Sequence, residues 1–261
     1  MATTVTVVGD GPTAALHALA AEDAGLQRTA SGGDLLVVAA SAGERVGLAL
    51  VGLERGAAVL VDPPLSADDL ATLVEADGGR RLLWLSDHRR FAPAWTTALR
   101  LAPGTSDHVS VLVARPGGDG EGDDPVAVLG PSALAAAEEL GGPATSVTVR
   151  QDPGATAAVL DVGLAGGATA TLRLELGADV AVWHAQAAGA DHVVSVELAP
   201  EPLVERNGEP VPVPRRHQTR DDRLEHLGYV DQVLAVVAGV GGQVGEDLRR
   251  LRLLEGAASA P

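Results

Sequence analysis

The chain has 261 residues and a formal net charge of −16, and all 19 of its basic residues are arginine. So acidic a chain repels phosphate backbones, which excludes nucleic acid as a partner, and the absence of lysine excludes Schiff-base chemistry on this chain. There is no cysteine, which excludes disulfides, thiolate metal sites and a cysteine nucleophile.

The amino-terminal stretch MATTVTVVGDG lacks the basic and long apolar segments of a signal peptide. No apolar run approaches the roughly 18 residues that a membrane span needs. No spacing of the His-x-x-x-His kind is present, so no metal site is expected. We therefore expect a cytoplasmic protein whose partner is a small molecule and not a membrane.

The first hundred residues alternate between predicted strands and helices. The predicted strands are residues 4–8, 35–40, 57–62 and 80–87. The predicted helices are residues 12–25, 45–56, 66–79 and 93–102. The strand at 35–40 is apolar throughout, as parallel strands covered on both faces are. This order predicts a parallel sheet with right-handed crossovers.

The pattern changes to α+β after residue 103, so we expect one domain at 1–103 and a second at 104–261, with its C-terminal helices packing back. Alternating residues and Gly-Gly turns predict antiparallel strands. These strands are 107–116, 145–152, 156–164, 168–176, 179–186 and 192–200. Residues 117–125 are predicted to be a flexible acidic loop, and Asn207-Gly208 a hairpin turn. Helices are predicted at 132–142, 221–239 and 246–259.

The order of these elements, with several particular stretches, resembles the Gfo/Idh/MocA oxidoreductases, the family of glucose–fructose oxidoreductase and inositol dehydrogenase. VTVVGDGPTAALH resembles the first strand and glycine turn of that family, and LSDHRRFAPAW resembles its Asn-Arg-Arg-Phe segment. LDVGLAGGATATLRLEL is similar to a strand of its sheet. The resemblance implies a truncated Rossmann-like parallel-sheet domain, followed by an open, mostly antiparallel sheet with helices on one face. It also implies a homo-oligomer through that sheet face.

The chain departs from the family at the positions that carry its chemistry. The Glu-Lys-Pro of the family falls on Asp62, Pro63 and Pro64, so proline stands where the resemblance implies a substrate-positioning lysine. The Asp-x-x-x-His motif falls on Ala127 and Pro131, in a stretch without histidine. The resemblance therefore implies that the usual proton donor has been lost.

The glycine turn is incomplete as well. Gly9 and Gly11 remain from the G-x-G-x-x-G/A pattern, which seats a pyrophosphate on helix N–H groups, whereas Pro12 removes one N–H. Gly9, Gly11 and Thr13 are the candidate cofactor-binding residues if a dinucleotide binds at all. The alternative is a tight turn kept for packing, because a partial glycine pattern is a weak signal. The stretch LQRTASGGD offers no acid for the ribose hydroxyls.

The candidate catalytic residues are Asp62, at the carboxyl end of a predicted strand, and His88, Arg89 and Arg90, which follow the next one. His88 could act as an acid or base near neutral pH, and either arginine could hold a carboxylate or enolate. Asp62 could be a base or a hydrogen-bond acceptor, or simply a turn residue before proline. The arginines could instead pair with surface acids.

Asp87, Trp183 and His184 are the candidate substrate-binding residues. Trp183 and His184 are neighbours on one predicted strand and therefore face opposite sides of the sheet. One of the two is expected to face the domain interface. Other notable side chains are interpreted as core, structural or solvated: Trp84, Trp95, His17, His108, Arg215, Arg216 and His217.

Three functions are compatible with this pattern. The leading hypothesis is that the scaffold has lost redox chemistry, needs no cofactor, and acts as a cyclase, isomerase or lyase of specialised metabolism. The first alternative is an NAD- or NADP-dependent oxidoreductase with a reshaped site, in which His88 handles the proton. The second is a non-catalytic partner subunit of a true oxidoreductase.

Overall fold

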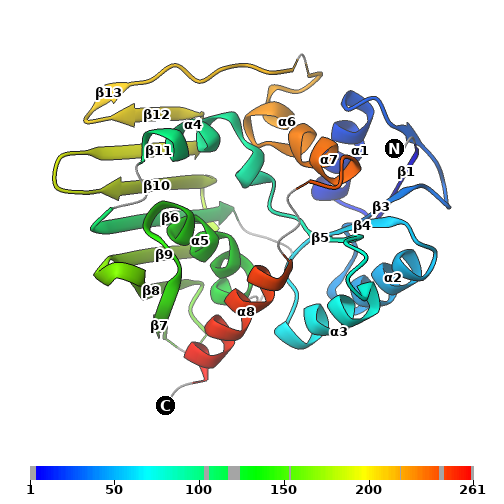
Figure 1. The fold of residues 1–261 in the computed structure, drawn as a ribbon, viewed down its shortest axis with the longest axis horizontal. Coiled ribbons are helices and arrows are strands. Elements are labelled where there is room, and N and C mark those ends of the chain that lie inside the picture. The colour runs from blue at the N-terminus through cyan, green and yellow to red at the C-terminus, as the bar shows by residue number, and fades with distance from the viewer. Residues whose placement is uncertain are drawn as a thin grey trace. The chain divides into compact units, whose positions relative to one another are not determined.

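The computed structural model of the protein describes residues 4–102, 106–116, 124–152, 154–217, 219–240 and 244–259 (Figure 1). Contacts divide the chain into two compact units. The first comprises Met1–Ala92 and Arg215–Leu248, and the second Pro93–Pro214 and Arg249–Pro261. Each unit has its own sheet. The domain boundary expected after residue 103 stays a prediction.

The first unit is built on a five-stranded parallel sheet in the order β2-β1-β3-β4-β5. Its strands are β1 (Thr4–Val8), β2 (Gln27–Arg28), β3 (Leu35–Val38), β4 (Ala58–Val61) and β5 (Leu83–Leu85). Its helices are α1 (Pro12–Asp23), α2 (Ala42–Glu54), α3 (Ala67–Asp77), α6 (Asp222–His226) and α7 (Tyr229–Val237), with the short 3-10 helix η1 (His88–Phe91).

Side chains on the two faces of this sheet meet different helices. Leu35 and Val37 of β3 belong to a buried cluster that includes α1 and α7 residues. Leu36 lies between them in sequence and therefore points to the other face. There its side chain packs closely against α2, because a Cβ added at Gly52 would lie 2.6 Å from the Leu36 side chain. Helices thus pack on both faces of the parallel sheet, as such sheets require.

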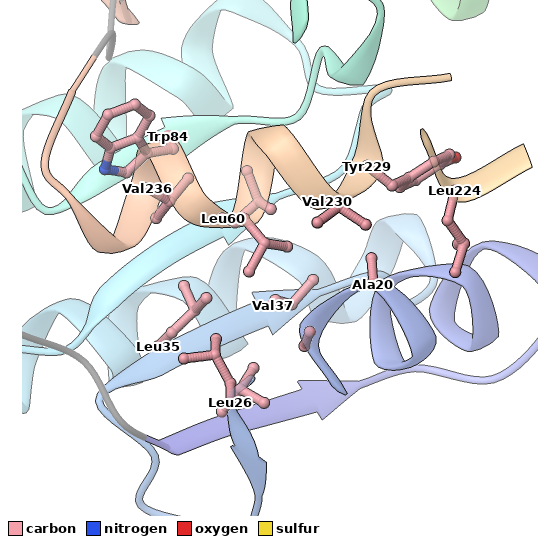
Figure 2. Close-up of a cluster of buried hydrophobic side chains, with 13 residues drawn as sticks. Ala20, Leu26, Leu35, Val37, Leu60, Trp84, Leu224, Tyr229, Val230 and Val236 are labelled. Atoms are coloured by element: carbon pink, nitrogen blue, oxygen red, sulfur yellow. The ribbon is translucent and has the colours of Figure 1, made fainter. Parts of the chain in front are cut away.

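The main core of the first unit lies between the sheet and the α1 and α7 helices. Figure 2 shows Ala20 of α1 and Val230 of α7 among strand side chains, including Leu60. Because α7 comes from residues beyond 214, this core joins the two ends of the sequence that form the unit. Trp84 is buried in the same cluster, which confirms its interpretation as a core residue.

The second unit contains an eight-stranded sheet in the order β13-β12-β11-β10-β6-β9-β8-β7. Its strands are β6 (His108–Pro116), β7 (Ala144–Arg150), β8 (Ala157–Leu164), β9 (Thr169–Ala178), β10 (Val182–Ala188), β11 (Val193–Ala199), β12 (Leu203–Arg206) and β13 (Glu209–Pro210). The β6–β9 pair is parallel and the other pairs are antiparallel.

One face of the eight-stranded sheet is apolar and covered by helices. Ala170, Leu172 and Leu174 of β9 are buried, whereas the alternate residues Thr171 and Arg173 are more exposed. The helices of this unit are α4 (Pro93–Leu101), α5 (Pro125–Gly141) and, for the most part, α8 (Val244–Ala258); a 3-10 turn, η2 (Ala165–Gly167), joins β8 to β9. The fold class expected from the sequence is therefore confirmed in both parts.

Local sequence signals explain several element ends. Ser66 begins α3 as predicted, because its hydroxyl accepts the Asp69 N–H at 3.1 Å in a capping box. Asn207 and Gly208 have φ angles of 53° and 82°, which suits the hairpin turn between β12 and β13. These turn and cap residues act through the backbone of their immediate neighbours, so they can be recognised from the sequence.

Three predicted elements differ in the structure. A short second strand, β2, occurs where only a link was expected. α5 begins at Pro125 and contains Pro131, so it is longer than the predicted helix at 132–142. The predicted helix at 221–239 is two helices, because Gly228 between them has a φ of 82°. Most of the acidic loop at 117–125 lies outside the described residues. None of the helices described is long and apolar enough to cross a membrane.

Candidate functional site

Loops after the carboxyl ends of β1, β3, β4 and β5 meet at one edge of the parallel sheet. They contain Gly9–Gly11, Ala39–Ser41, Asp62–Pro64 and Ser86–Asp87. Ligands of open α/β sheets bind at this edge. The structure therefore brings the glycine turn, Asp62 and the residues around His88 to the same edge of the first unit.

Asp62 forms a buried pair with His17 of α1. The His17 Nε2 atom lies 2.8 Å from the Asp62 Oδ1 atom, and the two side chains are 0% and 8% exposed. His17 Nδ1 and Asp62 Oδ2 are buried as well, and neither has a hydrogen-bond partner among the described residues. Because α1 follows the glycine turn, this pair links that turn to the end of β4. The pair therefore contains two buried polar atoms without a partner among the described residues.

Tyr229, the single tyrosine of the chain, contacts both histidines near this edge. Its ring stacks on His88 with centroids 4.1 Å apart and planes at 19°. It meets His17 edge to face, with a centroid separation of 5.2 Å and an angle of 78°. The first residue of α7 thus connects η1 to α1, so His88, Tyr229 and His17 form one contiguous group.

His88 is held in one ring orientation by the backbone. Its Nδ1 atom lies 2.7 Å from the Leu227 carbonyl oxygen. Because a carbonyl oxygen only accepts hydrogen bonds, Nδ1 carries the proton and Nε2 presents a lone pair in the neutral ring. Burial lowers the pKa of His88 from its usual value of 6.5, against the opposing effects of Leu227 and Asp87. The neutral, proton-accepting form therefore predominates near pH 7.

Gly228 explains how α7 comes so close to His88. A Cβ at this position would lie 2.3 Å from the His88 carbonyl oxygen and 2.4 Å from the Ala92 nitrogen. The φ of 82° is also one that side-chain-bearing residues rarely adopt. The sequence therefore needs glycine here to seat the start of α7 against η1.

The two arginines after β5 differ in their exposure and partners. Arg89 is 2% exposed, and its Nη2 donates to Asp87 Oδ2 at 2.8 Å. Its guanidinium is thus committed to the neighbouring acid inside the unit. Arg90 is partly exposed. Of the two arginines, Arg90 is the one accessible to a ligand.

Arg45 of α2 provides a cation that the sequence analysis did not single out. It is 7% exposed, and its guanidinium donates to the Ala40 carbonyl at 2.8 Å and to the Pro64 carbonyl. Burial lowers the pKa of Arg45, while attraction to Asp62 opposes this shift. A fixed positive charge therefore lies at the end of β4 although position 63 is proline.

The glycine turn has some features that suit a pyrophosphate. No side chain caps the start of α1 and its first turn contains no acid, so the positive end of the helix dipole is available to an anion. A Cβ at Gly11 would meet nothing within 4 Å, and Thr13 lies in the first turn. Gly9 is different, because its Cβ would lie 2.2 Å from the Ala39 carbonyl oxygen. The turn fits a phosphate at Gly11 and Thr13, whereas close packing explains Gly9.

The two substrate-binding candidates of the second unit lie on opposite faces of its sheet. Trp183 of β10 meets Trp95 of α4 edge to face, with centroids 5.2 Å apart, so it lies on the helix-covered face. His184 pairs with Leu112 of β6 and points to the other face. Trp95 is fully buried, as interpreted from the sequence. Whether Trp183 or His184 touches a substrate stays a prediction.

The basic run at Arg215, Arg216 and His217 is paired with acids of its own unit. Arg216 Nη1 and His217 Nε2 lie 2.9 Å and 2.8 Å from the Asp231 carboxylate, and Arg215 lies 3.6 Å from Asp222. Within the described parts of the chain, no group of three or more His, Asp or Glu side chains could hold a metal ion.

Sequence reasoning interpreted His17 as structural and did not single out Arg45 or Tyr229. One signal was available for His17: it lies with Ala14, Ala18 and Ala21 on the buried stripe of α1, where a polar residue needs a partner. Arg45 and Tyr229 reach the site from α2 and α7. Only the folded chain brings these elements to the sheet edge.

Comparison with solved structures finds proteins of the same fold. GenD2 from gentamicin A biosynthesis, solved in complex with NAD, is 21% identical with a TM-score of 0.76; the match covers 99% of this chain and 95% of that one. UDP-N-acetylglucosamine 3-dehydrogenase GnnA from Acidithiobacillus ferrooxidans is 17% identical with a TM-score of 0.78, covering 98% and 96%. A myo-inositol dehydrogenase from Corynebacterium glutamicum is 14% identical with a TM-score of 0.74, covering 99% and 96%. The scan against protein-family models and the comparison with curated proteins find no match.

These matches correct the leading functional expectation. A cyclase, isomerase or lyase without a cofactor was inferred from the loss of lysine and histidine at the family's positions. Two of the matched proteins are dehydrogenases, and the third was solved in complex with NAD. The inference was based on single positions of the sequence, whereas the structure also places Arg45 and His17 near the end of β4 from other elements. The fold is that of the Gfo/Idh/MocA dehydrogenases, as the resemblance in the sequence implied.

Proposed function

We propose that the protein is a nicotinamide-dependent oxidoreductase that interconverts a secondary alcohol and a ketone on a small polyhydroxylated molecule. The observation that carries this proposal is the state of His88. Its Nδ1 is fixed on the Leu227 carbonyl, and burial keeps the ring neutral near pH 7. A neutral imidazole with Nε2 available is a suitable general base for a hydroxyl proton.

The reaction needs a hydride acceptor and a proton acceptor. A bound nicotinamide would supply the hydride acceptor. His88 Nε2 takes the hydroxyl proton, and Tyr229 stacked on its ring limits its rotation. In the reverse direction, protonated His88 returns the proton to the carbonyl oxygen. Gly11 and Thr13 at the start of α1 would hold the pyrophosphate.

The substrate class is supported by the proteins of the same fold. One acts on the 3-position of UDP-N-acetylglucosamine and another on myo-inositol, and both substrates carry several hydroxyl groups.

Calorimetric titration of the full chain with NADH and NADPH tests the cofactor requirement directly. Saturable binding of at least one nucleotide is expected. A panel of sugars and cyclitols would then be screened with NAD⁺ and NADP⁺ for the appearance of the reduced nicotinamide. If neither nucleotide binds at millimolar concentration, the protein is not this kind of enzyme, and a role as a non-catalytic partner becomes the better explanation.

The role of His88 is tested with a matched pair of variants. His88→Gln keeps a polar side chain but has no titratable nitrogen, so kcat should fall about 10²- to 10⁴-fold while cofactor binding persists. His108→Gln is the control, because His108 is exposed on β6 in the second unit, with Nδ1 on Thr169. Equal activity in both variants would remove His88 from the mechanism.

A homo-oligomer formed through the uncovered face of the eight-stranded sheet remains part of the proposal. His184 of β10 and Thr171 and Arg173 of β9 lie on this face, opposite the buried residues. Light scattering coupled to gel filtration measures the assembly. Replacing Thr171 by Glu should shift an oligomer towards the monomer, since it adds buried charge to a self-complementary contact.

A further inference from the structure

The second strand of the parallel sheet is shorter than the first. β2 pairs with β1 only at Thr4↔Gln27 and Val5↔Arg28. β1 continues to Val8 before the glycine turn begins. Three residues of β1 therefore extend beyond its partner, which leaves β2 about 10 Å short of the sheet edge at ~3.3 Å per residue.

The chain after β2 stays beside the amino-terminal half of β1. The Thr29 N–H donates to the Val5 carbonyl at 2.8 Å, and its hydroxyl lies 3.1 Å from that of Thr6. Gly33 N–H then donates to the Thr6 hydroxyl at 3.1 Å. A Cβ on Gly33 would lie 2.7 Å from the Thr6 nitrogen. These contacts direct the link across β1 towards β3 and away from the glycine turn.

The charged residues of this stretch are engaged elsewhere. Asp34 is the only acid between Gly25 and Ser41. Its Oδ2 accepts from the Thr4 N–H at 3.2 Å and from the Thr4 hydroxyl at 2.9 Å, at the amino end of β1. Arg28 pairs with Glu22 at 3.4 Å, near the end of α1. Both side chains therefore lie at the edge of the sheet opposite the glycine turn.

In dinucleotide-binding sheets, the end of the second strand distinguishes the two nicotinamide cofactors. An acid there binds the adenosine ribose 2′-hydroxyl of NAD, or an arginine accommodates the 2′-phosphate of NADP. We propose that this chain makes no specific contact with the adenosine end of its cofactor. It therefore binds NADH and NADPH with similar affinity and also binds reduced nicotinamide mononucleotide. The inference rests on the proposed function and concerns only which nicotinamide compounds the site takes.

The test is calorimetric titration of the full chain with NADH, NADPH and reduced nicotinamide mononucleotide in one buffer. A single hydrogen bond to a charged group contributes about 1.5–3 kcal/mol, which corresponds to roughly 10- to 100-fold in Kd. All three Kd values are therefore expected to agree within about tenfold. A larger spread between any two would overturn the inference while leaving the oxidoreductase proposal intact. Binding of none of the three would instead refute the proposed function.

Three variants locate the contacts. Arg28→Ala should leave the ratio of the NADH and NADPH Kd values unchanged; selective weakening of NADPH would identify Arg28 as a 2′-phosphate ligand and overturn the inference. Gly11→Ala should weaken all three compounds together. Gly25→Ala is its matched control, since both glycines have positive φ and open space around a Cβ, but Gly25 lies at the far end of α1. Equal effects of the two substitutions would show that the losses come from α1 itself and not from a contact at Gly11.

Discussion

His17 and Asp62 lie 45 positions apart in the sequence, and their side chains meet in a 2.8 Å contact inside the first unit. The contact joins the helix after the glycine turn to the end of the fourth strand. Neither ring nor carboxylate is appreciably exposed. A buried polar group that loses its partner is costly, so each residue constrains what can stand at the other position.

A double-mutant cycle with His17→Leu and Asp62→Leu measures this dependence. Each single substitution leaves the other polar group buried and unpaired, so the free energy of unfolding should fall by about 1–3 kcal/mol in each case. The double variant buries two apolar side chains, and its loss should be smaller than the sum of the single losses. Urea unfolding of the four proteins gives the coupling energy. Strict additivity would mean that the pair does not interact in solution.

The lowered pKa of His88 makes stability depend on pH in a definite direction. Between the lowered folded pKa and the ordinary value of 6.5, the unfolded chain binds a proton that the folded chain does not. The free energy of unfolding should therefore fall as the pH decreases below about 6.5, and His88 should add no pH dependence above it. His88→Gln should show a smaller loss between pH 7.5 and pH 5.5 than the parent protein. An NMR titration of the imidazole that gave a raised pKa would contradict this expectation.

Gly228 and Gly239 at the two ends of α7 form a matched pair. Both have positive φ, so alanine costs about 1–2 kcal/mol of backbone strain at either position. At Gly239 a Cβ meets nothing within 4 Å, whereas at Gly228 it would overlap the His88 carbonyl. Gly228→Ala should therefore lose about 1–3 kcal/mol more than Gly239→Ala. Chemical denaturation compares the two, and similar midpoints would show that η1 and α7 can separate at little cost.

Glu138 holds a cluster of charges in the second unit. Its carboxylate accepts from Arg250 Nε at 2.6 Å, from Arg249, and from the Ala144 N–H at 2.8 Å. Glu138→Gln removes the carboxylate that accepts from Arg250, a side chain that is 5% exposed. It should lower the free energy of unfolding by about 3–5 kcal/mol. Glu201→Gln is the control on an exposed turn, and its effect should be within about 0.5 kcal/mol of zero.

Much of the fold could be predicted because its signals are local. Apolar strands, glycine turns and the Ser66 cap each depend on residues that are close together in the sequence. These signals predicted the parallel sheet and the antiparallel one. β2 was missed because a strand of two residues is too short to show an alternation of apolar and polar side chains. The break at Gly228 was missed because glycine is tolerated inside a helical pattern, and only the approach of the His88 backbone requires it there.

The candidate site was harder to predict because its contacts are long-range. Asp62 and His88 could be placed by their position after strands. Their contacts come from the start and the end of the chain, since His17 pairs with Asp62, and Leu227 and Tyr229 contact His88. The orientation of Arg89 also depends on packing and not on its neighbours in sequence. The expectation of lost redox chemistry failed for the same reason, since it was based on single aligned positions.

The position of β6 determines the order in which the eight-stranded sheet can assemble. β9 and β10 are separated by only three residues, yet they do not pair, because β6 lies between them. The β7–β8–β9 and β10–β13 groups each join neighbours in sequence, and such local contacts form quickly. β6 lies between these two groups and provides the parallel contact with β9. We therefore expect β6, the first of these strands in the sequence, to dock last, and its release to separate the two groups of strands.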